Sequence, residues 1–128
     1  MKVFNYTPHA ITVVTGAEYC PEIRKYVRTE NTTIVTSIES SGMLNARMTT
    51  IDADPINGIP AFEKAITGCD MLPEDIGDDD IVVVSALYAT AYARVYGTDS
   101  RLYTVADPVY DREGGMRVCG CRGICKAF

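Results

Sequence analysis

The clearest pattern in the chain is a run of β-branched apolar residues that leads directly into a helical repeat. Ile81–Val84 reads I-V-V-V and predicts a buried strand. Ser85 follows as a favourable helix N-cap, because its hydroxyl can accept a hydrogen bond from an amide of the first turn. Gly97 is placed to end the helix as a C-cap. The pattern therefore predicts one principal helix, over about residues 86–96, packed on a sheet.

Two rows of side chains recur at i, i+4 and i+8 within this helix. The apolar row, which we expect to face the core, consists of Leu87, Ala91 and Val95. The adjacent row, which we expect to be half exposed, consists of Tyr88, Tyr92 and Tyr96. Tyrosine combines an apolar ring with a polar rim, so such a row suits stacking on a ligand ring or a subunit interface. We favour the interface and predict a homo-oligomer, most simply a twofold dimer.

The rest of the chain alternates between short apolar runs and turn residues. The runs that predict strands are Lys2–Tyr6, Ala10–Val14, Thr32–Ser37, Leu44–Ile51, Ile59–Ile66, Arg101–Ala106, Pro108–Tyr110 and Met116–Cys121. Asn57-Gly58 indicates a hairpin, and Asp111–Gly115 indicates a second one. Tyr19–Arg28 fits either a loop or one short helix. The predicted fold is a single α+β domain over residues 1–128, with a mainly antiparallel sheet and one principal helix.

Composition narrows the possible partners. The 128 residues carry a formal net charge of −5, which argues against binding to polymeric nucleic acid. No window approaches the roughly 20 apolar residues that span a membrane, so no membrane partner is expected. The start of the chain has no apolar signal-peptide core, and an odd number of cysteines, five, suggests reduced thiols. These features predict a cytoplasmic protein.

Three of the cysteines lie close together in C-G-C-R-G-I-C, as Cys119, Cys121 and Cys125. Such a cluster fits either a metal loop or a terminal strand whose small side chains face the core. Zinc sites usually combine two cysteine pairs, or one pair with histidines, and His9 is the only histidine. We therefore expect no metal and no cofactor. The run Asp78–Asp80 similarly fits a solvated turn better than a divalent-cation site.

Several short motifs together resemble a family of small proteins encoded in bacteriophage and prophage genomes. The motifs, in chain order, are Asn5–Ile11 (N-Y-T-P-H-A-I), Asn57–Pro60 (N-G-I-P), Ile81–Leu87 (I-V-V-V-S-A-L), Asp107–Val109 (D-P-V), Asp111–Gly114 (D-R-E-G) and Gly120–Gly123 (G-C-R-G). The chain departs from the family in Cys119, Cys125 and the long segment Thr15–Asn31. The resemblance implies a phage origin and expression in the cytoplasm of the bacterial host, and it implies no enzymatic activity.

The junction between the predicted strand and helix is a candidate anion site. Free amides at a helix start attract negative charge, here at Ser85 and Ala86 with Tyr88 beside them. Arginines gather in the last quarter of this acidic chain, and their planar forks suit phosphate. If the last strand lay beside the strand that ends at Ser85, Arg117 or Arg122 would reach this helix start.

Asn5, Thr7 and His9 alternate along the first strand and share one face, which predicts a polar rim for the same site. His9 could bind a ligand or exchange protons, since imidazoles titrate near neutral pH, or its ring could cap the turn. Nucleophile motifs and glycine-rich phosphate loops are absent from the sequence, so no catalytic residue is predicted.

Two functions of different classes follow. The first is a non-catalytic protein that sequesters a small anionic signalling molecule of bacterial antiphage defence, of the cyclic or ADP-ribose type of nucleotide. The second is a phage structural or interaction protein that binds a host or phage protein through the tyrosine row. A small hydrolase that uses His9 is a third alternative.

Overall fold

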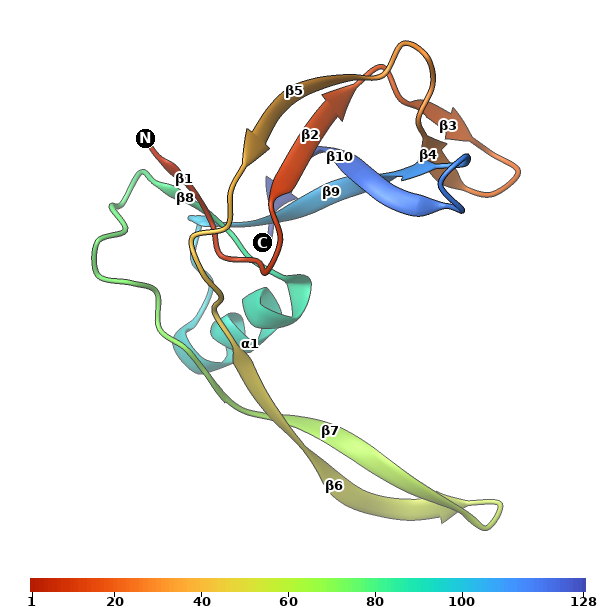
Figure 1. The fold of residues 1–128 in the computed structure, drawn as a ribbon. Coiled ribbons are helices and arrows are strands. Elements are labelled where there is room, and N and C mark those ends of the chain that lie inside the picture. Colours follow the sequence, from red (N-terminus) through yellow and green to blue (C-terminus); the bar gives the residue numbers. More distant parts are fainter.

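The computed structural model describes residues 1–128 as ten strands and one helix. In chain order the elements are β1 (Val3–Asn5), β2 (Ile11–Thr15), β3 (Glu18–Cys20), β4 (Lys25–Val27), β5 (Thr33–Ile38), β6 (Ala46–Ile56), β7 (Ile59–Cys69), β8 (Ile81–Val83), α1 (Ala86–Tyr96), β9 (Leu102–Asp111) and β10 (Arg117–Lys126). The α+β class is confirmed, with one helix beside a curled sheet (Figure 1). No helix is long and apolar enough to cross a membrane.

The large sheet is mixed, so the prediction of a mainly antiparallel sheet is confirmed only in part. Its strands follow the order β1-β8-β9-β10-β2-β5, and the β3–β4 hairpin joins it through β4 and β9. The pairs β1–β8, β8–β9, β10–β2 and β4–β9 are parallel. The pairs β9–β10, β2–β5 and β3–β4 are antiparallel. The parallel pairs join strands that are not consecutive along the chain or are linked through α1; β1 and β8, for example, lie side by side although about eighty residues of chain separate them.

The strand–helix unit has the predicted form. Ser85 is the N-cap of α1, and its hydroxyl accepts a hydrogen bond from the Tyr88 amide at 3.1 Å. Gly97 ends the helix with φ of 92°, a left-handed value that suits glycine, and its amide donates to the Ala93 carbonyl. The two caps explain why the helix starts and ends where the sequence predicted.

Of the row of α1 predicted to face the core, only Ala91 does so. Tyr88 is only 1% exposed, whereas Leu87 and Val95 are 50% and 44% exposed. The core contacts are instead made by Tyr88 and Tyr92, together with Ala89 and Ala91. The hydroxyl of the buried Tyr88 donates to the Asp70 carbonyl oxygen, which offsets the cost of burying this polar group.

Strand β8 separates two apolar clusters. Val82 and Val84 pack with Tyr88 on the helix side, while Val83 packs with Ile11 and other residues on the opposite side. All three valines are at most 1% exposed. Alternate side chains of a strand point to opposite faces, so a continuous apolar run is required when both faces are covered.

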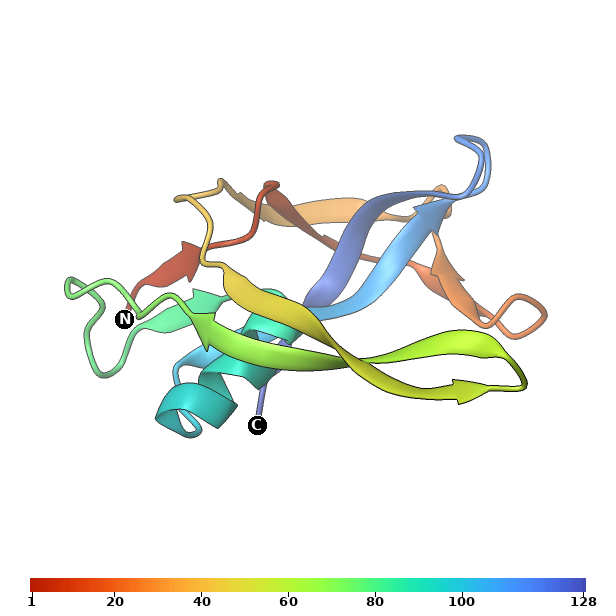
Figure 2. The same ribbon diagram turned by 90° about the horizontal axis from the view of Figure 1, so that it is seen from below.

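Strands β6 and β7 form a separate two-stranded sheet, which we call the ribbon (Ala46–Cys69). The predicted hairpin turn is confirmed: Asn57 and Gly58 have φ values of 50° and 79°, as a two-residue hairpin turn requires. Strand β6 extends further towards the turn than predicted and includes Asp52–Ile56. The ribbon projects away from the large sheet (Figures 1 and 2).

Two further segments differ from their predicted structure. Tyr19–Arg28 contains the β3–β4 hairpin rather than a loop or helix, with Arg24 at φ of 55° in its turn. Arg101–Ala106 and Pro108–Tyr110 are parts of the single strand β9, in which Asp107 has φ of 50°. The proline, which has no amide to donate, is accommodated beside this irregularity.

Candidate ligand-binding site

The N-terminal turn is organised by one buried amide side chain. Asn5 is fully buried, and its Nδ2 donates to the carbonyl oxygens of His9 at 2.8 Å and Ile38 at 3.0 Å. Its Oδ1 accepts from the Thr7 amide at 2.9 Å and from the Thr7 hydroxyl at 2.6 Å. Asn5 therefore ties β1, the following turn and β5 together. The structure brings Asn5, Thr7 and His9 together as predicted, but the Asn5 side chain has no group left for a ligand.

His9 is one of the residues that line a pocket with a volume of about 440 Å³. Its walls come from the turn before β2, from β9 and from an irregular part of β10, where the register shifts between Val118 and Gly120. The lining residues are Thr7, His9, Ala10, Ile11, Thr12, Val105, Val118, Cys119, Gly120 and Cys121. This volume lies within the roughly 300–1,000 Å³ of typical small-molecule sites.

A close approach of two strands shapes this pocket. A Cβ atom on Gly120 would lie 2.9 Å from the Thr12 carbonyl oxygen and 3.1 Å from a methyl carbon of Val14. Only glycine lets β10 lie this close to β2 without displacing backbone. Gly120 belongs to the G-C-R-G motif, so this part of the motif has a packing role beside the pocket.

The pocket is mostly apolar and carries few groups that could hold an anion. Its hydroxyls come from Thr7 and Thr12, and His9 is the one lining residue whose side chain could carry a positive charge. The Thr7 hydroxyl is already engaged with Asn5. The arrangement can bind a ring through its apolar walls and the edge of that ring through a few hydrogen bonds.

The predicted anion site at the helix start is not assembled. Ser85 and Ala86 are exposed at the end of β8, and β9 lies between β8 and β10 in the sheet. Arg117 pairs with Asp111, eight residues along β9 from Tyr103, which pairs with β8. At about 3.3 Å per residue this separation is roughly 25 Å. Arg117 therefore supplies no charge to the amides at Ser85.

Two of the arginines near the end of the chain, Arg101 and Arg122, are engaged elsewhere. Arg122 donates to the Asp107 carboxylate and to the Tyr26 hydroxyl, both at 2.9 Å, and its guanidinium lies 4.4 Å from the centre of the Tyr26 ring. Arg101 forms a hydrogen-bonded ion pair with Asp99 at 2.7 Å and holds the pKa of that carboxyl below its usual range. Both side chains therefore have structural partners within the chain.

The tyrosine row holds the base of the ribbon against α1. The Tyr88 hydroxyl donates to the Asp70 carbonyl oxygen at 2.6 Å, and the Tyr96 hydroxyl donates to the Cys69 carbonyl oxygen at 3.4 Å. Burial raises the pKa of Tyr88 and of Tyr92. Tyr88, predicted to contact a ligand, is thus a structural residue, whereas Tyr96 is 45% exposed, as the sequence predicted for the row.

The cysteines are all unpaired, and no group of three histidine, cysteine or carboxylate side chains is arranged to hold a metal. Cys121 is buried in the smaller apolar cluster, and burial raises the pKa of its thiol. Cys119 is half-buried in the pocket wall, and Cys125 is exposed. The cluster lies on strand β10, as the strand alternative predicted, but only Cys121 of the three faces the core.

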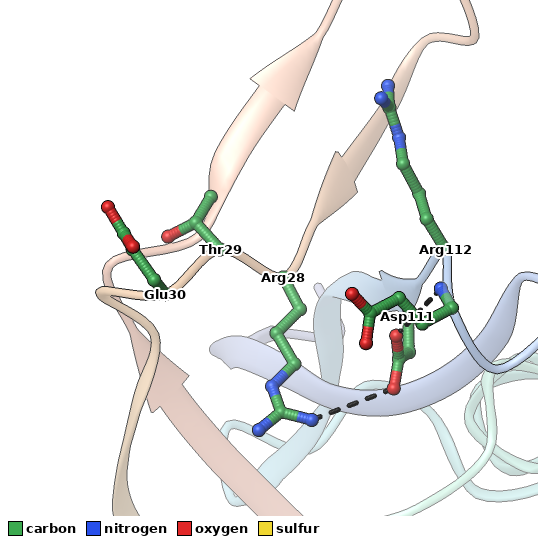
Figure 3. Close-up of a pocket in the computed structure, with 6 residues that line it drawn as sticks. Arg28, Thr29, Glu30, Asp111 and Arg112 are labelled. Atoms are coloured by element: carbon green, nitrogen blue, oxygen red, sulfur yellow. Dashed lines mark hydrogen bonds and ion pairs between the residues drawn. The ribbon is translucent and has the colours of Figure 1, made fainter.

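The sequence did not single out a second, polar pocket of about 380 Å³ between β4 and the β9–β10 turn. It is lined by Arg28, Thr29, Glu30, Asp111, Arg112 and Glu113. Figure 3 shows the Arg28 guanidinium directed at Asp111, 3.6 Å away, while Arg112 extends away from that pair and donates to the Cys20 sulfur. Three carboxylates against two guanidiniums leave no net positive charge for an anion. No local sequence signal joins segments eighty residues apart, so only the fold reveals this pocket.

Comparison with known proteins yields no relative. The chain matches no protein-family model, no curated protein and no solved structure. The candidate site therefore rests on its own geometry.

Proposed function

We propose that the protein is a non-catalytic binding protein that captures a small molecule in the pocket beside His9. The observation that carries this proposal is the convergence of Thr7 and His9, from the N-terminal turn, with the irregular part of β10 around one pocket. Asn5 fixes the turn through four hydrogen bonds, so the pocket wall is preorganised. Preorganisation lowers the entropic cost of binding.

The lining chemistry favours the ring of a nucleotide-derived molecule over its phosphates. Ala10, Ile11, Val105 and Val118 supply apolar surface, which suits the faces of a planar ring. With His9 as the one lining residue able to carry positive charge, phosphates would point to solvent. The phage-like motifs support a role in sequestering a signal of bacterial antiphage defence, of the cyclic or ADP-ribose type, in the host cytoplasm.

The test is ligand capture from cells. Purified protein is incubated with a nucleotide extract of infected, defence-active bacteria, washed, heated to release bound molecules, and the released fraction is analysed by mass spectrometry. We expect release of an intact nucleotide-derived molecule. A processed product would instead indicate an enzyme, and an empty fraction would contradict ligand capture.

A matched pair of variants places the ligand. Val118→Trp fills the pocket mouth and should abolish capture, whereas Val35→Trp, on β5, should leave it unchanged. The two valines are similarly exposed, at 60% and 62%, so the variants differ mainly in location. Equal capture by both variants would place the ligand elsewhere.

An interaction protein is the second candidate, and the exposed edge of the large sheet favours it. Strand β5 ends the strand order, so one row of its backbone groups is unpaired, and Ile34 and Val35 are largely exposed. Such an edge can add a strand from another protein. Ile34→Pro should abolish this binding, and co-purification from infected cells with and without the substitution tests it. A partner that is retained by the variant would exclude β5 as the contact.

A further inference from the structure

The tip of the ribbon carries an asparagine that is followed by a glycine in an exposed turn. Asn57 and Gly58 form the two-residue loop that closes the Ile56–Ile59 pair, and both are exposed. This turn lies at the far end of the ribbon, away from the large sheet (Figures 1 and 2). None of the other asparagines of the chain precedes a glycine; they are Asn5, Asn31 and Asn45. The ribbon turn is therefore chemically distinct among the asparagine positions.

Asparagine is among the chemically labile residues of proteins, and this position suits its best-known reaction. The backbone nitrogen of Gly58 attacks Cγ of Asn57 and closes a five-membered succinimide ring, and the side-chain nitrogen leaves as ammonia with the proton given up by the Gly58 amide. Water then opens the ring at either carbonyl carbon, which yields aspartate or isoaspartate. Glycine favours the attack because it has no side chain to hinder its own nitrogen. No neighbouring atom crowds it either, since a Cβ atom built on Gly58 would have nothing within 4 Å.

The closed turn opposes this reaction, so the rate depends on how easily the turn opens. Asn57 and Gly58 have φ values of 50° and 79°. Ring closure requires rotation about the Asn57 backbone, out of this left-handed conformation, to bring the Gly58 nitrogen against Cγ. The observed rate is therefore the rate in the open tip multiplied by the fraction of time for which the tip is open.

Three observations indicate that the tip opens while the rest of the fold stays intact. The register of the ribbon shifts between Ala53 and Ile56, so the Ile56–Ile59 pair is separated from the regular part of the ladder. Ile56 and Ile59 are 65% and 66% exposed, so opening the tip uncovers little apolar surface. The tip projects away from the large sheet (Figure 1), and an isolated two-stranded hairpin is only marginally stable in water. Opening of the tip therefore costs much less free energy than unfolding of the core.

The base of the ribbon is the opposite case. Asn45 is also exposed, but the Asp70 carboxylate accepts from the Asn45 amide and from Arg47, both at 2.8 Å. The Asp70 amide donates to the Asn45 carbonyl oxygen, and the Tyr88 hydroxyl donates to the Asp70 carbonyl oxygen. Opening of the chain at Asn45 therefore requires the loss of these bonds. The two ends of the ribbon differ in how freely the backbone moves beside an exposed asparagine.

We propose that Asn57 is a site of spontaneous deamidation, with water as the co-reactant and local opening of the ribbon tip as the controlling step. The reaction changes the tip in two ways. Either product replaces a neutral amide by a carboxylate, which adds one negative charge to the formal net charge of −5. Isoaspartate also adds one carbon atom to the main chain of a two-residue turn, which no longer holds Ile56 opposite Ile59. The modification does not depend on the ligand pocket.

Ageing of the folded protein tests the site. The unchanged protein is kept at neutral pH and physiological temperature, and its proteolytic peptides are followed by mass spectrometry, in which each deamidation adds about 1 Da. We expect this gain in the peptide that contains Asn57, with isoaspartate that an isoaspartate methyltransferase labels, and no gain at Asn31 or Asn45. Asn57→Gly keeps a residue that suits the turn and should show no gain in this peptide. An intact Asn57 after the time in which a free peptide of the same sequence is fully converted would overturn the proposal.

A second glycine at the base of the ribbon tests the role of tip opening. Ala46→Gly places a glycine after Asn45, so the same dipeptide then stands at both ends of the ribbon. In the folded variant, which circular dichroism checks, Asn57 should deamidate at least about tenfold faster than Asn45, and in urea the two rates should become similar. Asn5→Ala weakens the fold far from the ribbon and should leave the Asn57 rate unchanged. Similar rates at the two sites of the folded Ala46→Gly variant, or an Asn57 rate that rises in Asn5→Ala, would overturn local opening as the controlling step.

Discussion

The β8–α1 unit and the ribbon were both predicted from strong local signals, yet they reach opposite levels of burial. In the first unit Val82, Val83 and Tyr88 are almost completely buried. In the ribbon, the strands β6 and β7 are longer than β8 and are joined by a well-formed turn, yet Ile56 and Ile59 remain about two-thirds exposed. Turn chemistry and strand pairing therefore determine local shape, whereas burial depends on what the rest of the chain places nearby.

This difference has an energetic consequence. The β8–α1 unit gains from apolar burial on both sides of β8, at about 25 cal/mol per Å² of apolar surface. The monomeric ribbon gains mainly from backbone pairing and cross-strand contacts, each worth less than about 1 kcal/mol. Substitutions of similar size should therefore have unequal effects in the two regions.

The largest effect is expected for Tyr88→Ala. The substitution empties a fully buried site and removes the hydrogen bond to the Asp70 carbonyl oxygen, which holds the base of the ribbon. Loss of a buried aromatic side chain typically lowers the free energy of unfolding by about 3–5 kcal/mol. Urea denaturation followed by circular dichroism measures this change. A loss below about 1 kcal/mol would contradict the buried position.

A smaller loss, of about 2–4 kcal/mol, is expected for Asn5→Ala. The change leaves the carbonyl oxygens of His9 and Ile38 and the Thr7 amide without their buried partner. His9→Ala is the control, because the turn uses the His9 carbonyl rather than its exposed imidazole. The control should change the free energy of unfolding by less than about 0.5 kcal/mol. Equal losses in the two variants would refute this account of the turn.

Alkaline pH should weaken the helix side of the molecule. Burial raises the pKa of Tyr88 and Tyr92 above the usual value of 10.0, so these phenols stay protonated in the folded chain when they ionise in the unfolded chain. Their contribution to stability is therefore present below about pH 10 and is lost as the pH rises further. The slope approaches about 1.4 kcal/mol per pH unit for each group. Melting temperatures of the unchanged protein and of Tyr88→Phe, compared above pH 10, should show a shallower decline in the variant; identical slopes would exclude Tyr88 as a source.

Local sequence signals predicted the parts of the fold that local interactions build. Ser85 and Gly97 cap the two ends of the helix through their own hydrogen bonds. Asn57-Gly58 adopts its turn without contacts from distant parts of the chain. The two rows of α1 share the same spacing, so periodicity could not choose between them. The choice depends on acceptors at Cys69 and Asp70, which come from a distant part of the chain.

In the candidate site, too, local contacts could be predicted from the sequence and contacts between distant strands could not. Thr7 and His9 lie together because a few residues of chain connect them, and the structure confirms their proximity. The prediction that Arg117 or Arg122 joins Ser85 required β10 to neighbour β8, and strand order is set by the whole sheet. Because β9 lies between β8 and β10, the arginines of β10 are separated from the helix start at Ser85. The sequence alone does not give this strand order.

The smallest effect is expected for Phe62→Ala, the ribbon's counterpart of Tyr88→Ala. Phe62 is 59% exposed and is paired with Asp52 across the ribbon, so its removal should lower the free energy of unfolding by less than about 0.5 kcal/mol. Ile51→Ala removes a smaller side chain that is similarly exposed, at 52%, so its loss should be equally small. Urea denaturation followed by circular dichroism measures both changes beside that of Tyr88→Ala. A loss of more than about 1 kcal/mol in either ribbon variant would mean that burial does not distinguish the two regions.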